Sequence, residues 1–147
     1  MKYTFKPLTL RDEWEWAAPR AQCNWCEDTK GIIAYRGLDI VGAVILDSWS
    51  HNSVSIHLAI EDPITLRNGY PEEVFNYAFN TCGRGIILGA TPADNLKALK
   101  FNKHIGFKEV YRIKDGYKVG VDFVIFELRK EDCRYIEHGK EEHTAAA

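Results

Sequence analysis

The pattern of apolar and polar residues is clearest in one stretch past the middle of the chain, which predicts a buried strand, a turn and a helix. Residues 85–90 form a short apolar run bounded by glycines, which is typical of an interior strand. Pro92 is expected to stop this strand, and Asp94 or Asn95 can cap the helix by accepting from its first free N–H groups. Gly106 is expected to end the helix in the left-handed conformation.

At 100° per residue, the predicted helix has three faces. One narrow arc is apolar and is expected to point into the core; it carries Ala98, Phe101 and Ile105. The opposite face is basic and carries Lys97, Lys100 and His104. Asn95 and Asn102 lie seven positions apart on a stripe between these faces. They either line a cleft or stand solvated on the rim of the helix.

The N-terminal part of the chain predicts a strand followed by a broken helix. Residues 2–8 alternate loosely, as a first strand does. Thr9 and Asp12 have the spacing of a capping-box variant and are expected to start a helix. Pro19 is expected to break or restart it, with Trp25 near the end of the second piece.

Further along, the pattern predicts an antiparallel meander, a second helix and a closing hairpin. The meander strands are expected at residues 31–36, 40–47 and 53–61. The second helix is expected to begin at Pro71, because proline suits the first helical position. The hairpin is expected to have strands at residues 108–113 and 122–128 and a turn at residues 114–116.

This order of elements predicts an α/β (α+β) fold with a mixed, mostly antiparallel twisted sheet and helices on both faces. The strands at residues 53–61 and 85–90 are joined through a helix, so we expect them to run parallel. Residues 1–130 are expected to form a single domain, which is long enough to bury a core. Residues 131–147 are expected to form a C-terminal extension with a disordered end.

Composition excludes several classes of protein. The apolar fraction of 46% and the charged fraction of 27% are typical of a globular domain. A net charge of −2 gives no global attraction to nucleic acid or to an anionic membrane. Because the chain has neither a leader pattern nor an apolar run near the length of a membrane span, we expect a cytoplasmic location.

The four cysteines are expected to be free thiols rather than metal ligands. Cys23 and Cys26 form a CxxC pair, whereas Cys82 and Cys133 are isolated, and a closed zinc site needs four ligands. A thioredoxin-like motif would follow a strand, but this pair lies in a Trp-rich helical segment. Free thiols fit a reducing compartment, and we expect no metal.

The predicted strand and helix resemble motif B of the GNAT N-acetyltransferases, through the spacing Asn95-x-x-Ala98-x-x-Phe101-Asn102-x-x-x-Gly106-Phe107. The order of elements agrees with that family over residues 3–129. The resemblance implies that acetyl-CoA is the co-substrate and that Asn95 and Ala98 line its pantetheine arm. It also implies that the two parallel strands splay and that this arm fills the gap like a missing strand, beside Ala59 and Ile60. The chain departs from the family at Asn102, where a tyrosine usually protonates the leaving thiolate.

A loop before the second helix has the character of an anion site. Arg67, Gly69 and Tyr70 precede Pro71, and free N–H groups at a helix N-terminus attract anions. The loop resembles, in compressed form, the pyrophosphate loop of the family, whose usual pattern is Arg/Gln-x-x-Gly-x-Gly/Ala. The resemblance implies that Arg67, Gly69 and Tyr70 bind the coenzyme. It also places Trp14, Trp16 and Trp25 over the acceptor side, where they either shape a substrate pocket or act as core aromatics.

Acetyl transfer to an amine requires a base, a donor for the oxyanion and help for the departing thiolate. His57 and Glu61 share one face of a predicted strand, and the choice of base between them, or neither, stays open. Histidine has an unperturbed pKa of about 6.5, and Glu61 stands where the family often places a carboxylate. Asp122 could orient the acceptor amine instead. The amide of Asn102 could hydrogen-bond to sulfur, with water or Tyr117 completing the proton transfer.

We therefore expect an N-acetyltransferase that moves the acetyl group of acetyl-CoA to a primary amine by direct attack in a ternary complex. The acceptor stays open between a small molecule, a protein lysine and an aminated nucleobase; no membrane partner is expected, and a homodimer is a further expectation. Two alternatives remain: a catalytically silent acyl-CoA-binding module and an interaction protein without a CoA site. A weaker resemblance links the compressed loop and Asn102 to small GNAT proteins of bacteriophages.

Overall fold

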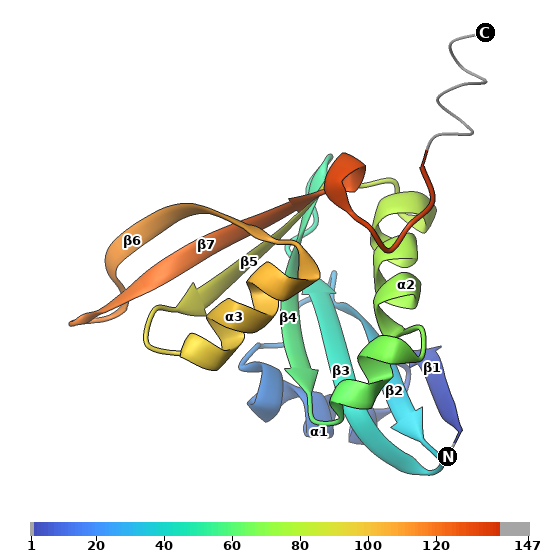
Figure 1. The fold of residues 1–147 in the computed structure, drawn as a ribbon. Coiled ribbons are helices and arrows are strands. Elements are labelled where there is room, and N and C mark those ends of the chain that lie inside the picture. Colours follow the sequence, from blue (N-terminus) through green and yellow to red (C-terminus); the bar gives the residue numbers. More distant parts are fainter. Residues whose placement is uncertain (1, 139–147) are drawn as a thin grey trace, which may run out of the picture.

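The computed structural model describes residues 2–138, which form one seven-stranded sheet with helices on both faces (Figure 1). The strands are β1 (Tyr3–Pro7), β2 (Lys30–Arg36), β3 (Asp39–Asp47), β4 (Ser53–Ile60), β5 (Ile86–Pro92), β6 (Lys108–Lys118) and β7 (Val121–Arg129). The helices are α1 (Arg11–Ala21), α2 (Tyr70–Phe75) and α3 (Leu96–Ile105), with shorter segments η1 (Pro63–Arg67), η2 (Asn76–Thr81) and η3 (Lys130–Asp132). The strand order is β1-β2-β3-β4-β5-β7-β6, and only β4 and β5 run parallel. The predicted fold class is confirmed.

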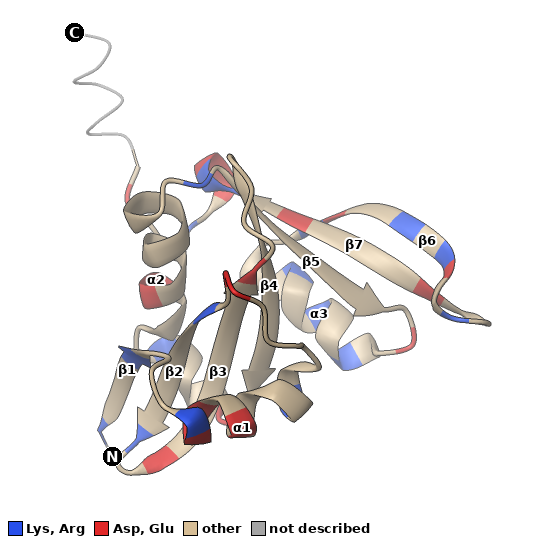
Figure 2. Cartoon of the chain, turned by 180° about the vertical axis from the view of Figure 1, so that it is seen from behind, with Lys and Arg blue, Asp and Glu red and all other residues tan. Residues whose placement is uncertain are grey.

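Strand alternation gives the sheet two apolar faces, and each face is covered by its own helices. The α1 face holds a cluster made of Ala17, Ile33, Ala43, Ile45 and Ala59. The opposite face packs against α2 and α3 through a larger cluster that includes Val44, Ile56, Val74 and Ile105. Seen from behind, α1 lies alone across the sheet and carries both acidic and basic residues (Figure 2). The two faces of β4 therefore meet different surroundings.

β4 and β5 run side by side for only a short distance. The paired residues are Ser53, Val54 and Ser55 of β4 with Ile86, Ile87 and Leu88 of β5. No further pairing between these strands occurs in the described part of the chain, although β4 continues to Ile60 and β5 to Pro92. Because β3 and β7 hold the outer edges of the two strands, the strands diverge around a gap between them. The expected splay is confirmed.

The strand, turn and helix around α3 follow the sequence prediction closely. Pro92 is the last residue of β5, and Asn95 is the N-cap of α3. The Asn95 Oδ1 accepts from the Ala98 N–H at 3.1 Å. Gly106 has φ 117° and donates to the Asn102 carbonyl at 3.2 Å, a position that a side chain would strain.

The start of α1 differs from the predicted capping box of Thr9 and Asp12. Leu10 is the N-cap, and the carboxylate that satisfies the free N–H groups belongs to Glu13. It accepts from the backbone N–H of Thr9 at 3.1 Å and of Leu10 at 3.0 Å. The acidic side chain of the capping pattern is therefore one position later than the sequence spacing indicated.

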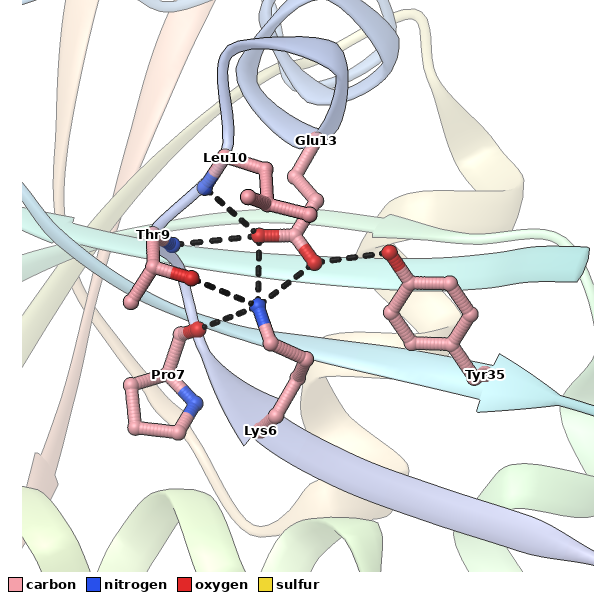
Figure 3. Close-up of polar contacts among 6 residues, drawn as sticks. All are labelled: Lys6, Pro7, Thr9, Leu10, Glu13 and Tyr35. Carbon is pink, nitrogen blue, oxygen red and sulfur yellow. Dashed lines mark hydrogen bonds and ion pairs between the residues drawn. The ribbon is translucent and has the colours of Figure 1, made fainter. Parts of the chain in front are cut away.

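Glu13 also ties α1 to β1 and β2 (Figure 3). Its fully buried carboxylate contacts the Lys6 Nζ at 2.6 Å and accepts from the Tyr35 hydroxyl at 2.7 Å. Burial alone raises the pKa of Glu13, but hydrogen bonds from Lys6, Tyr35 and the two backbone N–H groups outweigh it and lower that pKa to about 2. Burial and this carboxylate raise the pKa of Tyr35 to about 12. The ionised Glu13 side chain thus holds α1 against β1 and β2.

The predicted break at Pro19 is wrong. α1 continues through Pro19 to Ala21 and ends where Gln22 adopts a left-handed conformation with φ 55°. Pro19 removes a hydrogen bond to the carbonyl of Glu15, but both residues are exposed, so water can replace that donor. The next residues form a loop instead of a second helical piece, and Trp25 lies on that loop.

The predicted turn at residues 114–116 is also wrong. β6 continues to Lys118, and its register against β7 shifts between Ile113 and Lys118. Asp115 has φ 56° and its N–H donates to the Asp122 Oδ1 at 3.1 Å, which stabilises an irregular segment within the strand. Asp115 therefore adopts the left-handed conformation within a bulge of β6, and not in the predicted turn.

Residues beyond β7 pack back onto the domain. Cys133 and Ile136 are buried, and the Tyr135 ring stacks on Phe75 of α2 with centroids 5.5 Å apart. The disordered end predicted for the tail lies outside the described residues. Within residues 2–138, no helix has the length and apolar character needed to cross a membrane.

Candidate active site

A narrow apolar groove, with only about 20 Å³ of free space, lies over the splayed part of β4, between α2 and α3. Its floor on β4 is formed by Ile56, Leu58 and Ile60. Its walls are formed by Leu66, Tyr70 and Val74 on one side and by Phe101, Ile105 and Phe107 on the other. Such a lining suits an alkyl chain better than a charged group.

The edge of β4 that borders the gap carries free backbone groups. The Glu61 N–H donates to the Val41 carbonyl of β3 at 3.0 Å, which fixes the residues that face β3. Because successive residues direct their N–H and C=O groups to opposite edges, Leu58 and Ile60 direct theirs into the gap. Ala59, predicted beside the coenzyme together with Ile60, directs its backbone toward β3 and packs on the α1 face.

The loop at the start of α2 combines a tight backbone with an exposed cation. Gly69 is the N-cap and has φ 100°, a conformation that glycine adopts without strain. Arg67 is exposed at the end of η1. The Tyr70 side chain is buried, its hydroxyl donates to the Ile32 carbonyl, and its ring stacks on Phe5 at 4.9 Å. Only the backbone of Tyr70 can therefore meet a ligand at this end of α2.

The two asparagines of α3 lie at different places along the helix. Asn95 caps its first turn, as described above, and its side chain is exposed together with that of its neighbour Leu96. Asn102 is half-buried, and its Nδ2 donates to the Thr91 Oγ1 near the end of β5 at 2.9 Å. Asn102 thus borders the splayed end of β5, and half-buried Ala98 lies one turn before it.

His57 lies on the α1 face of β4, just beyond the last residue that pairs with β5. Its Nε2 lies 2.9 Å from the Asp47 Oδ1 on the neighbouring strand β3. The Asp47 side chain is 8% exposed and the His57 side chain 30% exposed. A nearly buried carboxylate therefore holds an imidazole that solvent still reaches.

Glu61, the other candidate base, is held in an ion pair. Its Oε2 lies 3.2 Å from the Nε of Arg20 on α1. The Arg20 guanidinium also lies over the Trp16 ring at 4.2 Å and donates to the Trp16 carbonyl at 2.8 Å. These contacts join the end of β4 to α1 through one oxygen of Glu61, whose side chain stays 58% exposed.

Asp122 and Tyr117, also considered from the sequence, belong to the β6–β7 hairpin. Asp122 accepts from Asp115 within that hairpin. The exposed Tyr117 packs against the Phe123 ring, with centroids 5.4 Å apart. Neither residue is brought into contact with His57 or Glu61 by the described interactions.

Trp14 and Trp16 lie on α1, and Trp25 and the CxxC pair lie on the loop that follows this helix. Trp14 packs edge-on against the exposed Trp25, with ring centroids 5.2 Å apart, so the two rings brace the loop against the helix. Burial, then the nearby charge of Asp47, raises the pKa of Cys23 to about 11, which keeps this thiol neutral. Among residues 2–138, no three of the side chains that commonly bind metals are grouped for coordination.

Sequence reasoning missed Asp47 and Arg20 as members of this region. Asp47 is a charged residue at the end of an apolar run, and this feature could have marked it as a candidate site residue. The register that pairs His57 with Ile45 was needed to place Asp47 beside the imidazole. Arg20 gave no signal, because its contact with Glu61 spans 41 positions.

No protein-family model and no curated protein sequence matches this chain. Solved structures do match it. A GNAT-family protein from Desulfovibrio desulfuricans superposes with a TM-score of 0.69 at 13% identity, over 87% of this chain and 99% of that one. A mutant of spermidine N-acetyltransferase SpeG from Vibrio cholerae gives a TM-score of 0.75 at 12% identity, over 92% and 96%.

A further SpeG structure, a complex with CoA and spermine, gives a TM-score of 0.69 at 13% identity, over 92% of this chain and 98% of that one. The matches span nearly the whole length of both partners, and they share the mixed sheet and helices described above. The chain therefore has the fold of the GNAT N-acetyltransferases.

Proposed function

We propose that this protein is an N-acetyltransferase that moves the acetyl group of acetyl-CoA to a primary amine by direct attack. The observation that carries this proposal is the divergence of β4 from β5, which leaves the backbone groups of Leu58 and Ile60 facing a gap beside an apolar groove. A ligand with amides and alkyl segments in extended form matches this site, because its amides pair with the strand while its alkyl segments contact the lining. The pantetheine arm of coenzyme A has this chemistry.

The phosphate end of the coenzyme is assigned to the loop before α2. The Arg67 guanidinium and the backbone of Gly69 and Tyr70 supply positive charge and free N–H groups. Glu72 and Glu73 lie in the same first turn and repel phosphate, so Arg67 has to offset them. We therefore assign much of the phosphate affinity to Arg67.

The thioester end is assigned to the gap between the strands. A backbone N–H of Leu58 or Ile60 is available to donate to the oxyanion. We assign Asn95 and Ala98 of α3 to contacts with the pantetheine arm. Asn102 is assigned to the sulfur: one of its amide protons is used by Thr91, and the second is available for a departing thiolate.

The acceptor amine is assigned to the α1 side of β4, opposite the groove. Both candidate bases, His57 and Glu61, lie on that side, so an amine entering there reaches the thioester through the gap. Spermidine and spermine are named for the Vibrio cholerae structures. For this chain, a polyamine, another small amine, a protein lysine and an aminated nucleobase are the acceptors to be tested.

A catalytically silent acyl-CoA-binding module is the second candidate function. The observation that favours it is Asn102, since an amide cannot donate a proton as an acid does. This candidate predicts acetyl-CoA binding without turnover, whereas an enzyme releases CoA thiol in the presence of an amine.

We also propose that the protein forms a homodimer. β6 is an edge strand that is exposed along its whole length and carries the apolar side chains Val110, Tyr111 and Ile113. Exposed edges of this kind pair with other chains. Sedimentation of a purified sample would show a dimer, and a monomer at all concentrations would contradict this part of the proposal.

The site assignment is tested by amide hydrogen exchange with and without acetyl-CoA. The N–H groups of Leu58 and Ile60 should become protected when the ligand binds, because the arm accepts from them. The N–H groups of the exposed β6 serve as the control and should not change. Exchange at Leu58 and Ile60 that is unaffected by bound acetyl-CoA would contradict the assignment.

A further inference from the structure

We infer that Asp47 and His57 act as a pair, in which His57 is the general base for the acceptor amine and Asp47 is its positioning residue. This inference rests on the proposed acetyl transfer, and it names the base that the sequence left open. It also assigns a different role to Glu61, which the ion pair with Arg20 holds as a link between β4 and α1.

The first observation is the geometry of the imidazole. The Nε2 of His57 lies 2.9 Å from the Asp47 carboxylate, so Nε2 carries the proton and donates it in the hydrogen bond. The other ring nitrogen, Nδ1, is then the unprotonated nitrogen that can accept from an amine. Asp47 fixes both the tautomer and the plane of the ring, because its side chain is only 8% exposed and comes from a central strand.

The second observation is the position of the pair in the sheet. Ser55 is the last residue of β4 that pairs with β5, and His57 follows two positions later on the α1 face. The ring is therefore at the point where the strands begin to separate. A thioester held in the gap would have His57 on its α1 side and Asn102 of α3 on the other side.

The third observation concerns the other charged groups of this region. Glu61 shares the face of β4 with His57, but its Oε2 is paired with the Arg20 Nε at 3.2 Å. Cys23, beyond α1, stays a neutral thiol because burial and Asp47 raise its pKa to about 11. Asp47 is thus the carboxylate that contacts the imidazole, and α1 otherwise presents the rings of Trp14 and Trp16.

The chemical step balances with these groups. The acceptor ammonium gives one proton to Nδ1 of His57, and the neutral amine attacks the thioester carbon to form a C–N bond. When the tetrahedral intermediate collapses, the C–S bond breaks and the electron pair leaves on sulfur. One of the two protons that remain on the nitrogen goes to the thiolate through water, and the other stays in the amide. The products are therefore the acetamide and CoA thiol, and His57 returns its proton to solvent.

The pair is tested first without catalysis, by ¹⁵N NMR of histidine side chains in the acetyl-CoA complex. The proposal predicts that neutral His57 is the Nε2–H tautomer in the wild-type protein. It predicts that Asp47→Asn removes this preference and lets the Nδ1–H tautomer appear, because the carboxylate no longer accepts from Nε2. His51, an exposed histidine in the turn before β4, serves as an internal reference. An Nδ1–H tautomer for His57 in the wild-type protein would overturn the proposal.

Steady-state turnover with acetyl-CoA and the fastest amine of an acceptor panel forms the second test. His57→Gln should lower kcat by about 100-fold or more, with the affinity for acetyl-CoA unchanged. Asp47→Asn should lower kcat by about tenfold, while His51→Gln leaves kcat unchanged. The proposal that His57 is the base would be overturned if His57→Gln kept full activity. It would also be overturned if Glu61→Gln lost more activity than His57→Gln. If the protein binds acetyl-CoA but acetylates no amine of the panel, the proposed function itself would be overturned.

Discussion

The Asn102 Nδ2 donates to the Thr91 Oγ1 at 2.9 Å, and this bond joins α3 to the splayed end of β5. Asn102, which we propose takes the place of the usual family acid, is therefore held by the strand that borders the gap. Its second amide proton is free to meet a sulfur atom. This arrangement fits a residue that assists thiolate departure by hydrogen bonding and does not supply a proton.

Asn102→Ala is expected to slow acetyl transfer about tenfold without abolishing it. A thiol has an unperturbed pKa of about 8.5, so the leaving group needs only modest help near neutral pH. Single-turnover transfer under saturating acetyl-CoA measures this step. Thr91→Val, which removes the partner hydroxyl but keeps the shape, is the matched control and should produce a smaller loss. Complete inactivity of Asn102→Ala with normal coenzyme binding would show that Asn102 has a larger role.

Asn95 is expected to serve both the helix and the coenzyme. Asn95→Ala should cost about 1 kcal/mol of unfolding free energy through the lost cap and should weaken acetyl-CoA binding. Asn95→Ser retains a capping oxygen, so it should restore the stability but not the affinity. Urea unfolding and calorimetric titration separate the two effects, with the exposed Lys97→Ala as a silent control. Normal affinity in Asn95→Ala would restrict Asn95 to capping.

Arg67→Ala is expected to reduce the affinity for acetyl-CoA, because it leaves Glu72 and Glu73 unopposed beside the phosphates. In the wild-type protein, acetyl-CoA at 100 times its dissociation constant should stabilise the fold by about 2.7 kcal/mol. That stabilisation should shrink in the variant at the same ligand concentration. Arg112→Ala, on the exposed β6, is the control, and equal stabilisation of both variants would exclude Arg67 from the site.

The Glu13 cluster predicts a stability that falls in acid. Glu13 has a pKa of about 2 in the fold and an ordinary value of 4.5, a difference that corresponds to about 3 kcal/mol. Because the pKa is lowered in the fold, this contribution is complete above about pH 5 and is lost as the pH falls toward 2. The stability advantage of wild type over Glu13→Gln, measured by urea unfolding, should shrink over that range. Asp12→Asn, exposed in the same turn, should show a much smaller pH dependence.

The sequence allowed the strand and helix of the proposed coenzyme site to be predicted in some detail, because their signals are local. The glycine-bounded strand, the Asn95 cap and the left-handed Gly106 follow one another within about 20 residues, and each depends on short-range backbone chemistry. The parallel pairing of β4 and β5 followed from the order of elements. The place where the strands separate did not, because it depends on the register at Ser55 and Leu88.

The surroundings of His57 and Glu61, on the proposed acceptor side, were predicted less well, because their contacts are long-range. Glu61 and His57 were recognised from alternation along one strand. Their different surroundings come from Arg20 and Asp47, which reach them from α1 and β3. The helix break at Pro19 was predicted wrongly for a related reason: the exposed side of a helix tolerates a missing hydrogen bond, and exposure is a tertiary property.

The central claim is most directly tested by measuring product and CoA thiol together in reactions of the purified protein with acetyl-CoA and each amine of the panel. Mass spectrometry identifies the acetylated amine, and a thiol reagent counts the released CoA. The account predicts that at least one amine is acetylated in equal amount to the CoA thiol released, and that omission of the amine abolishes the release. Tight binding of acetyl-CoA with no acetylated product from any amine, at any pH between about 6 and 9, would contradict it.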